Sequence, residues 1–272
     1  CRSLTSVTIP ASVTSIESQA FKGCSSLQSV IIADGVSGIE GGAFHSCPSL
    51  IDFDLGDNNT NYALEELKIL DGKESSKALY YSHKAIILDF AERVIAAEAA
   101  YIELFKSDET QGFRLTQLFG NLLERMGKPE EARKIYKKFS NANPGSTLLV
   151  PAYTRLLAKT KPKPLIATSV DGVAEALFNI GTSLREQRAR ETAMVFCRLA
   201  LWLRPEFPIA QLMMADMLDD GQRYIKANAL YASIDPRSPF RLPADLRRAR
   251  NLGVINRLDA AVKLLENSVK KY

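Results

Sequence analysis

Residues 171–208 read DGVAEALFNIGTSLREQRARETAMVFCRLALWLRPEFP. Two small residues, Gly181 and Ala193, stand twelve positions apart in this stretch, and Pro205 follows twelve positions after Ala193. Proline cannot donate the backbone hydrogen bond that continues a helix, so a helix must end before Pro205. Because two antiparallel helices approach closely only where small residues face each other, the stretch predicts a helix–turn–helix unit.

The same pattern recurs toward the C-terminus at a period of 34. The three series in register are Ala193, Ala227 and Ala261; Gly181, Ala215 and Ala249; and Leu184, Leu218 and Leu252. A further unit upstream has Gly120, Ala132, Tyr136 and Pro144 in the same relative places. A fixed period of 34 with small residues at the helix crossings is typical of a helical repeat array.

This spacing resembles the tetratricopeptide repeat over residues 113–272, with a fifth, degraded unit expected over 78–110. The first tryptophan-type position of that family is filled instead by Thr116, Leu177 and Gln211. Residues 171–208 are similar to tetratricopeptide proteins of bacteria. The resemblance implies a right-handed α-solenoid of four or five helix pairs.

Residues 1–55 follow a different period, of 23. Cys1, Cys24 and Cys47 align with one another, as do Leu4, Leu27 and Leu50. Short β-branched runs such as 7–9 and 30–32 predict one strand per turn, stacked so that neighbours bury a shared apolar face. We interpret the cysteines as rungs of this apolar ladder, since their spacing matches no zinc or redox motif. Lipidation of Cys1 is an alternative that the repeat phase makes unnecessary.

The stretch LTSVTIPASVTSIESQAFKGCSSL, residues 4–27, resembles the BspA-type leucine-rich repeat. The family resemblance implies a large surface protein that adheres to other molecules, and hence an external setting. Two complete units and part of a third are fewer than such arrays need, so we interpret the chain as a fragment or a recombined fusion.

Two segments interrupt the arrays. Residues 61–84, including Asp71-Gly72, are predicted to form a transition hairpin or linker, although Ala85, Ala97 and Tyr101 also fit the helical repeat.

The step from Ala132 to Ala193 is much longer than one period, which indicates an insertion. It contains residues 159–164, Lys-Thr-Lys-Pro-Lys-Pro, which should be extended and exposed, either as a solvated linker or as a basic docking segment.

Composition and motifs exclude several classes of protein. The chain of 272 residues is 46% hydrophobic and 24% charged, with a net charge of +4. It has no apolar run of membrane-spanning length, so we predict a soluble globular protein. His45 and His83 lack metal-ligand spacing, and no nucleophile elbow or phosphate-binding loop occurs. Asp219-Asp220 is interpreted as a solvated turn, and we therefore expect no enzyme activity, cofactor, metal or small-molecule substrate.

The tetratricopeptide resemblance implies a concave groove lined by the first helix of each pair. Carried over residue by residue, the predicted partner contacts are Gln117, Asn121, Phe178, Thr182, Arg185, Leu212, Asp216, Asp219, Leu246 and Arg250. Phe178, Leu212 and Leu246 would be apolar anchors. Asn121 matches the family's carboxylate clamp, but Gln117 stands where that clamp needs lysine, which argues against that activity.

The sequence thus predicts a mainly α protein with leucine-rich repeats over 1–60, a transition over 61–84 and a tetratricopeptide-like domain over 85–272. We predict a non-enzymatic protein–protein interaction scaffold that binds a protein or peptide in its groove. The alternative is adhesion through the leucine-rich face. Nucleic-acid binding through Arg241, Arg247, Arg248 and Arg250 is the weakest hypothesis, because no aromatic side chains are interleaved with them.

Overall fold

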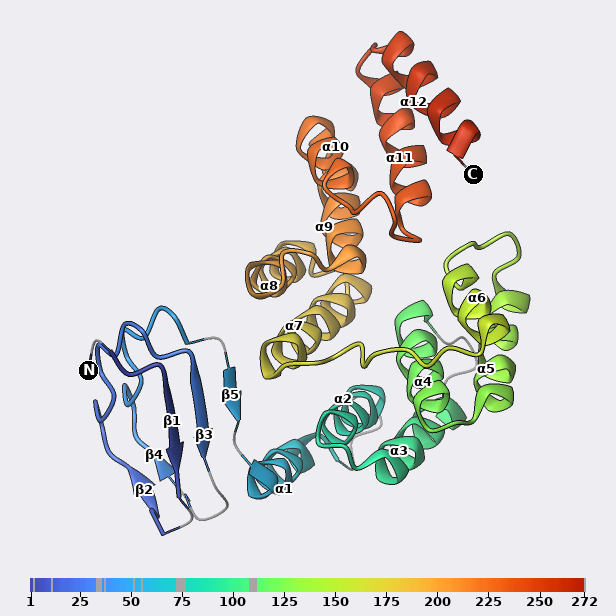
Figure 1. Ribbon diagram of the computed structural model, residues 1–272. Helices are drawn as coiled ribbons and strands as arrows, with labels where there is room; N and C mark the ends of the chain where they lie inside the picture. Colours follow the sequence, from blue (N-terminus) through green and yellow to red (C-terminus); the bar gives the residue numbers. More distant parts are fainter. Residues whose placement is uncertain are drawn as a thin grey trace. The chain divides into compact units, whose positions relative to one another are not determined.

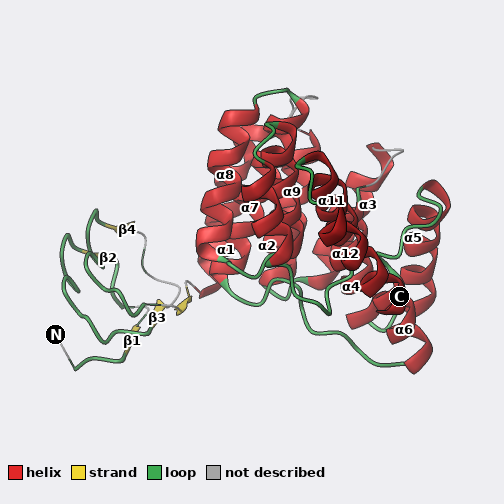
Figure 2. Ribbon diagram, turned by 90° about the horizontal axis from the view of Figure 1, so that it is seen from above, coloured by secondary structure: helices red, strands yellow, loops and turns green. Residues whose placement is uncertain are grey.

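The computed structural model describes residues 1, 3–10, 12–32, 36, 38–50, 52–54, 56–71, 77–107 and 112–271. The chain divides into two compact units, and Figure 1 shows the order of its strands and helices. Unit 1 comprises residues 1–109 and 166–172, and unit 2 comprises residues 110–165 and 173–272. Unit 1 contains the described strands and the first helices of the chain, whereas unit 2 is helical (Figure 2).

The strands of unit 1 form two parallel ladders that repeat the 23-residue period. Strands β1 (Ser6–Ile9), β3 (Ser29–Ile32) and β5 (Asp52–Asp54) form one sheet, and β2 (Ser15–Ile16) pairs with β4 (Gly38–Ile39). The register places Val7 beside Val30 and Val30 beside Phe53. Each strand therefore lies beside its own equivalent in the next repeat, as the sequence period predicts.

The core of this array is the predicted apolar ladder. Cys24 and Leu27 are buried, Cys47 packs against the same cluster, and the rings of Phe21 and Phe44 stack with centroids 5.1 Å apart. These residues confirm that two of the three aligned cysteines are apolar rungs. The third, Cys1, is exposed.

The segment predicted as a hairpin is helical instead. Helix α1 (Gly56–Leu67) continues into a short 3-10 turn, η1 (Lys68–Leu70), and α2 begins at Lys77. The last residues of α1, 63–67, are Ala-Leu-Glu-Glu-Leu, and these residue types favour a helix over a hairpin strand. The Asp71-Gly72 turn itself reaches outside the described residues.

Helices α2 (Lys77–Phe90) and α3 (Val94–Ser107) form the expected additional helix pair. Ala85 and Ala97, twelve positions apart, and Tyr101 are fully buried, as small and large residues are in the other pairs. This pair belongs to unit 1.

The tetratricopeptide-like pairs lie in unit 2, except that residues 169–172 at the start of α7 belong to unit 1. Their helices are α4 (Phe113–Arg125) with α5 (Pro129–Ala142), α7 (Ser169–Glu186) with α8 (Arg190–Leu203), α9 (Pro208–Asp220) with α10 (Tyr224–Ala232), and α11 (Arg241–Val254) with α12 (Leu258–Lys271). Each predicted small residue is buried at a helix crossing, and a Cβ added to Gly181 would lie 3.3 Å from the Ala193 carbonyl. The mainly α fold class with a short β-rich repeat segment is thus confirmed.

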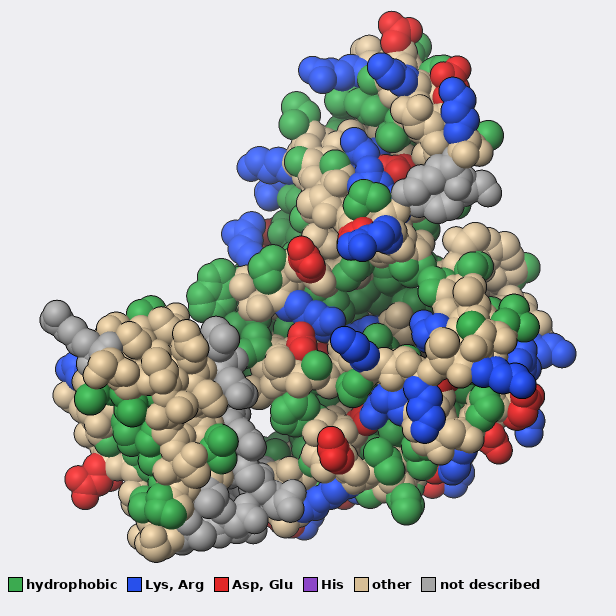
Figure 3. All heavy atoms as spheres, in the orientation of Figure 1, with side chains coloured by type: hydrophobic (Ala, Val, Ile, Leu, Met, Phe, Trp, Pro, Cys, Tyr) green, Lys and Arg blue, Asp and Glu red, His purple; other side chains and the backbone are tan. Residues whose placement is uncertain are grey.

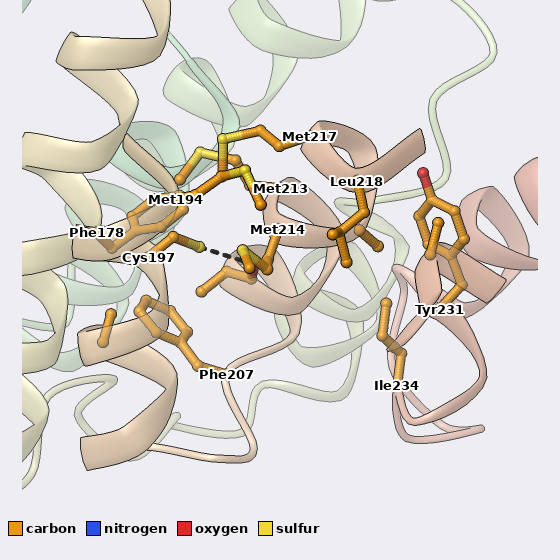
Figure 4. Close-up of a cluster of buried hydrophobic side chains, with 14 of the residues drawn as sticks. Phe178, Met194, Cys197, Phe207, Met213, Met214, Met217, Leu218, Tyr231 and Ile234 are labelled. Carbon is orange, nitrogen blue, oxygen red and sulfur yellow. Dashed lines mark hydrogen bonds between the residues drawn. The ribbon is translucent and has the colours of Figure 1, made fainter. Parts of the chain in front are cut away.

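A hydrophobic core lies across α7 to α11 (Figure 4). Methionines from α8 and α9 fill it together with Phe178 and Phe207, whose ring centroids are 5.3 Å apart. The Cys197 thiol donates a hydrogen bond to the Ala210 carbonyl at 3.3 Å, which joins α8 to α9. Flexible methionine side chains suit such irregular spaces between helices.

The insertion between the first two pairs contains a helix that the period alone did not predict. Helix α6 (Val150–Ala158) follows α5, and a connection without helix or strand leads from it to α7 (Figure 1). Among the helices described, none is both long and apolar enough to cross a membrane.

Candidate interaction site

The predicted partner contacts differ widely in exposure. Asn121, Phe178 and Asp219 are buried; Gln117, Thr182, Leu212 and Asp216 are half-buried; and Arg185, Leu246 and Arg250 are exposed. A partner can reach the exposed and half-buried side chains without any rearrangement. The three buried residues serve first as contacts within the protein.

Phe178 has a structural role that differs from the predicted apolar anchor. Its side chain is 5% exposed and packs in the core against Phe207. One turn later, the Thr182 hydroxyl donates to the Phe178 carbonyl at 3.0 Å and lies 3.5 Å from the Met213 sulfur. The Phe178 side chain points into the core because α7 packs closely on both α8 and α9.

A buried carboxylate joins the first helix pair to α6. The Glu124 carboxylate on α4 accepts a hydrogen bond from the Tyr136 hydroxyl on α5 at 2.6 Å and another from Arg155 on α6 at 2.9 Å. Burial raises the pKa of Tyr136, and the bond to Glu124 raises it further, so the hydroxyl remains a donor. The three residues hold α4, α5 and α6 together.

The third pair repeats this arrangement at the same sequence spacings, 12 and 31 positions. Asp219 on α9 accepts from the Tyr231 hydroxyl on α10 at 3.4 Å and from Arg250 on α11. Arg155 and Arg250 thus occupy equivalent places. Helix α6 therefore corresponds to the first helix of a pair, and no second helix of its own follows it in the described residues before α7. Burial also raises the pKa of Tyr231, and its hydrogen bond to Asp216 adds to the increase.

The second pair carries the opposite charges at the equivalent positions. Arg185 stands where the first and third pairs have a carboxylate, Cys197 where they have tyrosine, and Asp216 where they have arginine. Arg185 approaches Asp220 at 3.5 Å, and Asp216 binds Arg247 at 2.8 Å. The inner side chains of unit 2 are therefore held in place by ion pairs between successive first helices.

All four arginines considered for nucleic-acid binding take part in ion pairs. Arg241 and Arg248 bind opposite oxygens of Asp245 at 2.8 Å each, while Arg247 and Arg250 bind Asp216 and Asp219. On the face shown in Figure 3, basic and acidic side chains lie interspersed over the helical part. This charge pattern differs from the single-sign stripe typical of a nucleic-acid-binding surface.

A cleft of about 530 Å³ lies within unit 2, between the loop before α6 and helices α9 and α11. Its lining includes three of the predicted contacts, Leu212, Leu246 and Arg250. Figure 3 shows hydrophobic side chains gathered in a hollow of the helical part with basic side chains beside it. The volume falls within the usual range of ligand pockets, roughly 300–1,000 Å³.

The floor of the cleft is apolar and its rim is basic. Leu212, Phe240 and Leu246 supply apolar surface, and Leu246 is 51% exposed. At the rim, the Arg250 side chain is 63% exposed while its guanidinium is anchored on the buried Asp219. The Arg250 side chain is already fixed by Asp219, so it loses little rotamer entropy when its exposed part binds the carboxylate of a partner.

Sequence reasoning missed the cleft residues that precede the first helices. Phe240 comes immediately before α11, and Leu148 lies in the loop before α6. Phe207 and Leu149 hold the places directly before α9 and α6, and like Phe240 they are buried. An apolar residue directly before each of these helices was the available signal. Among the described residues, no group of three or more His, Cys, Asp or Glu could hold a metal ion.

Comparison with known families identifies the first part of the chain. The family model described as "BspA type Leucine rich repeat region (6 copies)" matches residues 1–68. This agrees with the sequence resemblance and with the parallel ladders of unit 1. No curated protein sequence matches the chain.

Comparison with solved structures finds chains that match at low sequence identity and low TM-score. The crystal structure of MamA is 17% identical, with a TM-score of 0.35 and coverage of 68% of this chain and 91% of MamA. PilF of Pseudomonas aeruginosa is 17% identical, with a TM-score of 0.34 and coverage of 79% and 85%. YrrB, titled a TPR protein with an unusual peptide-binding site, is 15% identical, with a TM-score of 0.34 and coverage of 78% and 91%.

Proposed function

We propose that the protein is a non-enzymatic interaction scaffold whose unit 2 binds a peptide segment of a partner protein in the cleft between the 145–148 loop, α9 and α11. The observation that carries the proposal is the combination of an apolar floor with an anchored arginine at the rim. This combination suits a peptide that places an apolar side chain on Leu212 and Leu246 and an acidic group at Arg250.

The architecture supports binding more than catalysis. Acid–base or nucleophilic catalysis requires a nucleophile, acid or base with access to a substrate. The Cys197 thiol is buried and donates to a backbone carbonyl, and the carboxylates of Asp216 and Asp219 are held in ion pairs with Arg247 and Arg250. The charged groups beside the cleft thus hold one another in fixed orientations, which suits binding of a partner.

A selection from a displayed peptide library on the full chain tests this proposal. We expect enrichment of peptides that carry an apolar residue near Asp or Glu. A Leu212→Ser/Leu246→Ser variant should bind the enriched peptides at least about tenfold more weakly, because each buried leucine contributes roughly 1.5–3 kcal/mol. Arg250→Met should weaken acidic peptides more than their amidated counterparts.

A matched control uses an exposed leucine outside the cleft. Leu157 is 76% exposed and does not line the cleft, so Leu157→Ser should leave peptide binding unchanged. Equal peptide binding by wild type and the Leu212/Leu246 variant would refute recognition in the cleft. The search would then move to the leucine-rich array, the alternative site of adhesion.

A further inference from the structure

The connection between α6 and α7 has the chemistry of an extended peptide. We call residues 159–165, Lys-Thr-Lys-Pro-Lys-Pro-Leu, the strap. Residues before proline avoid the helical region, and proline itself fixes φ near about −65°, so the two Lys-Pro pairs keep this segment extended. Figure 1 shows it as a long connection without helix or strand that passes α4 on its way to α7.

The main chain of the strap binds the face of α4 that carries Asn121, which we call the inner face of α4. The Asn121 amide donates a hydrogen bond to the Lys163 carbonyl at 3.0 Å. The Arg125 Nε in turn donates to the side-chain Oδ1 of Asn121 at 3.0 Å, which fixes the direction of the side-chain amide. Asn121 is 3% exposed and was predicted from the sequence to contact a partner in the groove.

A second contact holds the end of the strap. Arg204, which follows α8, lies with a guanidinium nitrogen 3.5 Å from the Leu165 carbonyl oxygen and with its guanidinium 4.8 Å from the centre of the Phe207 ring. Two carbonyls of the strap, two positions apart, therefore face donors on different elements. A bound extended peptide shows the same alternation of main-chain contacts.

The side chains of the strap divide in the same way. Pro162 and Leu165 are half-buried against the protein, whereas Lys161 and Lys163 are exposed. The protein thus holds the strap by its carbonyls and apolar side chains and leaves its charges in water. The sequence-based expectation of an exposed segment is correct for the lysines and wrong for Pro162, which is half-buried.

We infer that the inner face of α4 around Asn121 is a binding site for an extended, proline-containing peptide, and that the strap occupies it in cis. This site is distinct from the cleft of the proposed function. A partner peptide of the same chemistry gains access to Asn121 when the strap leaves. The strap is therefore a built-in competitor for part of the groove.

Tethering makes the strap a strong competitor. A segment joined by a short linker has an effective concentration of about 1 mM, which weakens binding of an outside peptide with a Kd of about 100 μM by roughly tenfold. Loosening the strap should remove this penalty while the face of α4 remains intact.

The test uses the full chain and a fluorescein-labelled peptide of sequence KTKPKPL, which copies residues 159–165. The strap variant is Pro162→Gly/Leu165→Ser, which removes the half-buried side chains and the fixed φ angle without changing α4. Fluorescence anisotropy should show peptide binding at least about tenfold tighter to the strap variant than to the wild type. Lys161→Ala, which changes an exposed side chain, should bind like the wild type.

Two further arms assign the site. Asn121→Ala in the strap variant should abolish the gain in binding, with circular dichroism confirming that the helices persist. Leu212→Ser/Leu246→Ser in the strap variant should leave KTKPKPL binding unchanged, so failure here is distinguishable from failure of the cleft proposal. Peptide binding no tighter in the strap variant than in the wild type up to about 1 mM peptide, or unaffected by Asn121→Ala, would overturn the inference.

Discussion

Gly120 is the position where a single methyl group should do most damage to the helical array. Its helix α4 crosses α5 at Tyr136, and a Cβ added to Gly120 would lie 2.1 Å from the Tyr136 Cε1 atom and 2.4 Å from its hydroxyl oxygen. Carbon atoms in contact are usually about 3.5–4.0 Å apart. Since both residues are buried, Gly120→Ala forces the tyrosine ring to move.

The expected cost combines three effects. Overpacking costs about 1–3 kcal/mol, and displacing the Tyr136 hydroxyl from the buried Glu124 carboxylate costs about 1.5–3 kcal/mol. Alanine gains about 1 kcal/mol over glycine in helix propensity. We therefore expect Gly120→Ala to lower the free energy of unfolding by about 1.5–5 kcal/mol.

Urea denaturation followed by circular dichroism measures this cost, with two other helical glycines as controls. A Cβ added to Gly181 meets its nearest atom at 3.3 Å. Gly181→Ala should therefore change stability by less than about 1 kcal/mol. Gly253 has no neighbouring atom within 4 Å of an added Cβ, so Gly253→Ala should be neutral or slightly stabilising. In a Tyr136→Ala background, Gly120→Ala should lose most of its cost; an undiminished cost there, or a wild-type denaturation midpoint for Gly120→Ala, would refute the reasoning.

Three further predictions concern individual polar groups. Glu175 is fully buried and binds Arg114 through both carboxylate oxygens. Glu175→Ala should therefore cost about 3–5 kcal/mol in urea denaturation; a loss below about 1 kcal/mol would contradict a buried pair. Burial, opposed weakly by Arg185, raises the pKa of the Cys197 thiol from 9.0 to about 12. The folded state then keeps a proton that the unfolded state loses, and stability falls as pH rises above 9. Between pH 9 and 11 the wild type should lose about 2–3 kcal/mol more than Cys197→Ala, whereas parallel pH profiles would disprove the shift. Thr168 and Asp171 exchange hydrogen bonds at the start of α7. Thr168→Ala should weaken this cap by about 1 kcal/mol and speed hydrogen exchange of the first-turn amides roughly fivefold; unchanged exchange would rule out a capping role.

Local spacing was sufficient to predict most of the repeat structure. Every repeat packs mainly on its neighbours, so the period determines which side chains meet. Cys24 and Cys47 align at one period, and Ala193 and Ala227 align at the other. The helix pair around Ala85 followed from the same rule. The hairpin prediction failed because residues 63–67 are strong helix formers and lie within helix α1.

The partner-contact set shows where spacing reaches its limit. Equivalent positions in successive first helices carry Asn121, Thr182 and Asp216, and the structure gives each a different neighbour: the strap, Met213 and Arg247. A register assigns a residue to one face of a helix. It does not say which other segment covers that face.

By itself, the sequence determined the two repeat periods, the class of each array and the residues at the helix crossings, since these depend on contacts between adjacent units. Tertiary structure decided which inner side chains remain open. Phe178 turned into the core, Asn121 was covered by the strap, and Phe240 and Leu148 came together beside Leu246. These outcomes join segments distant in the chain, and no local period records contacts of that range.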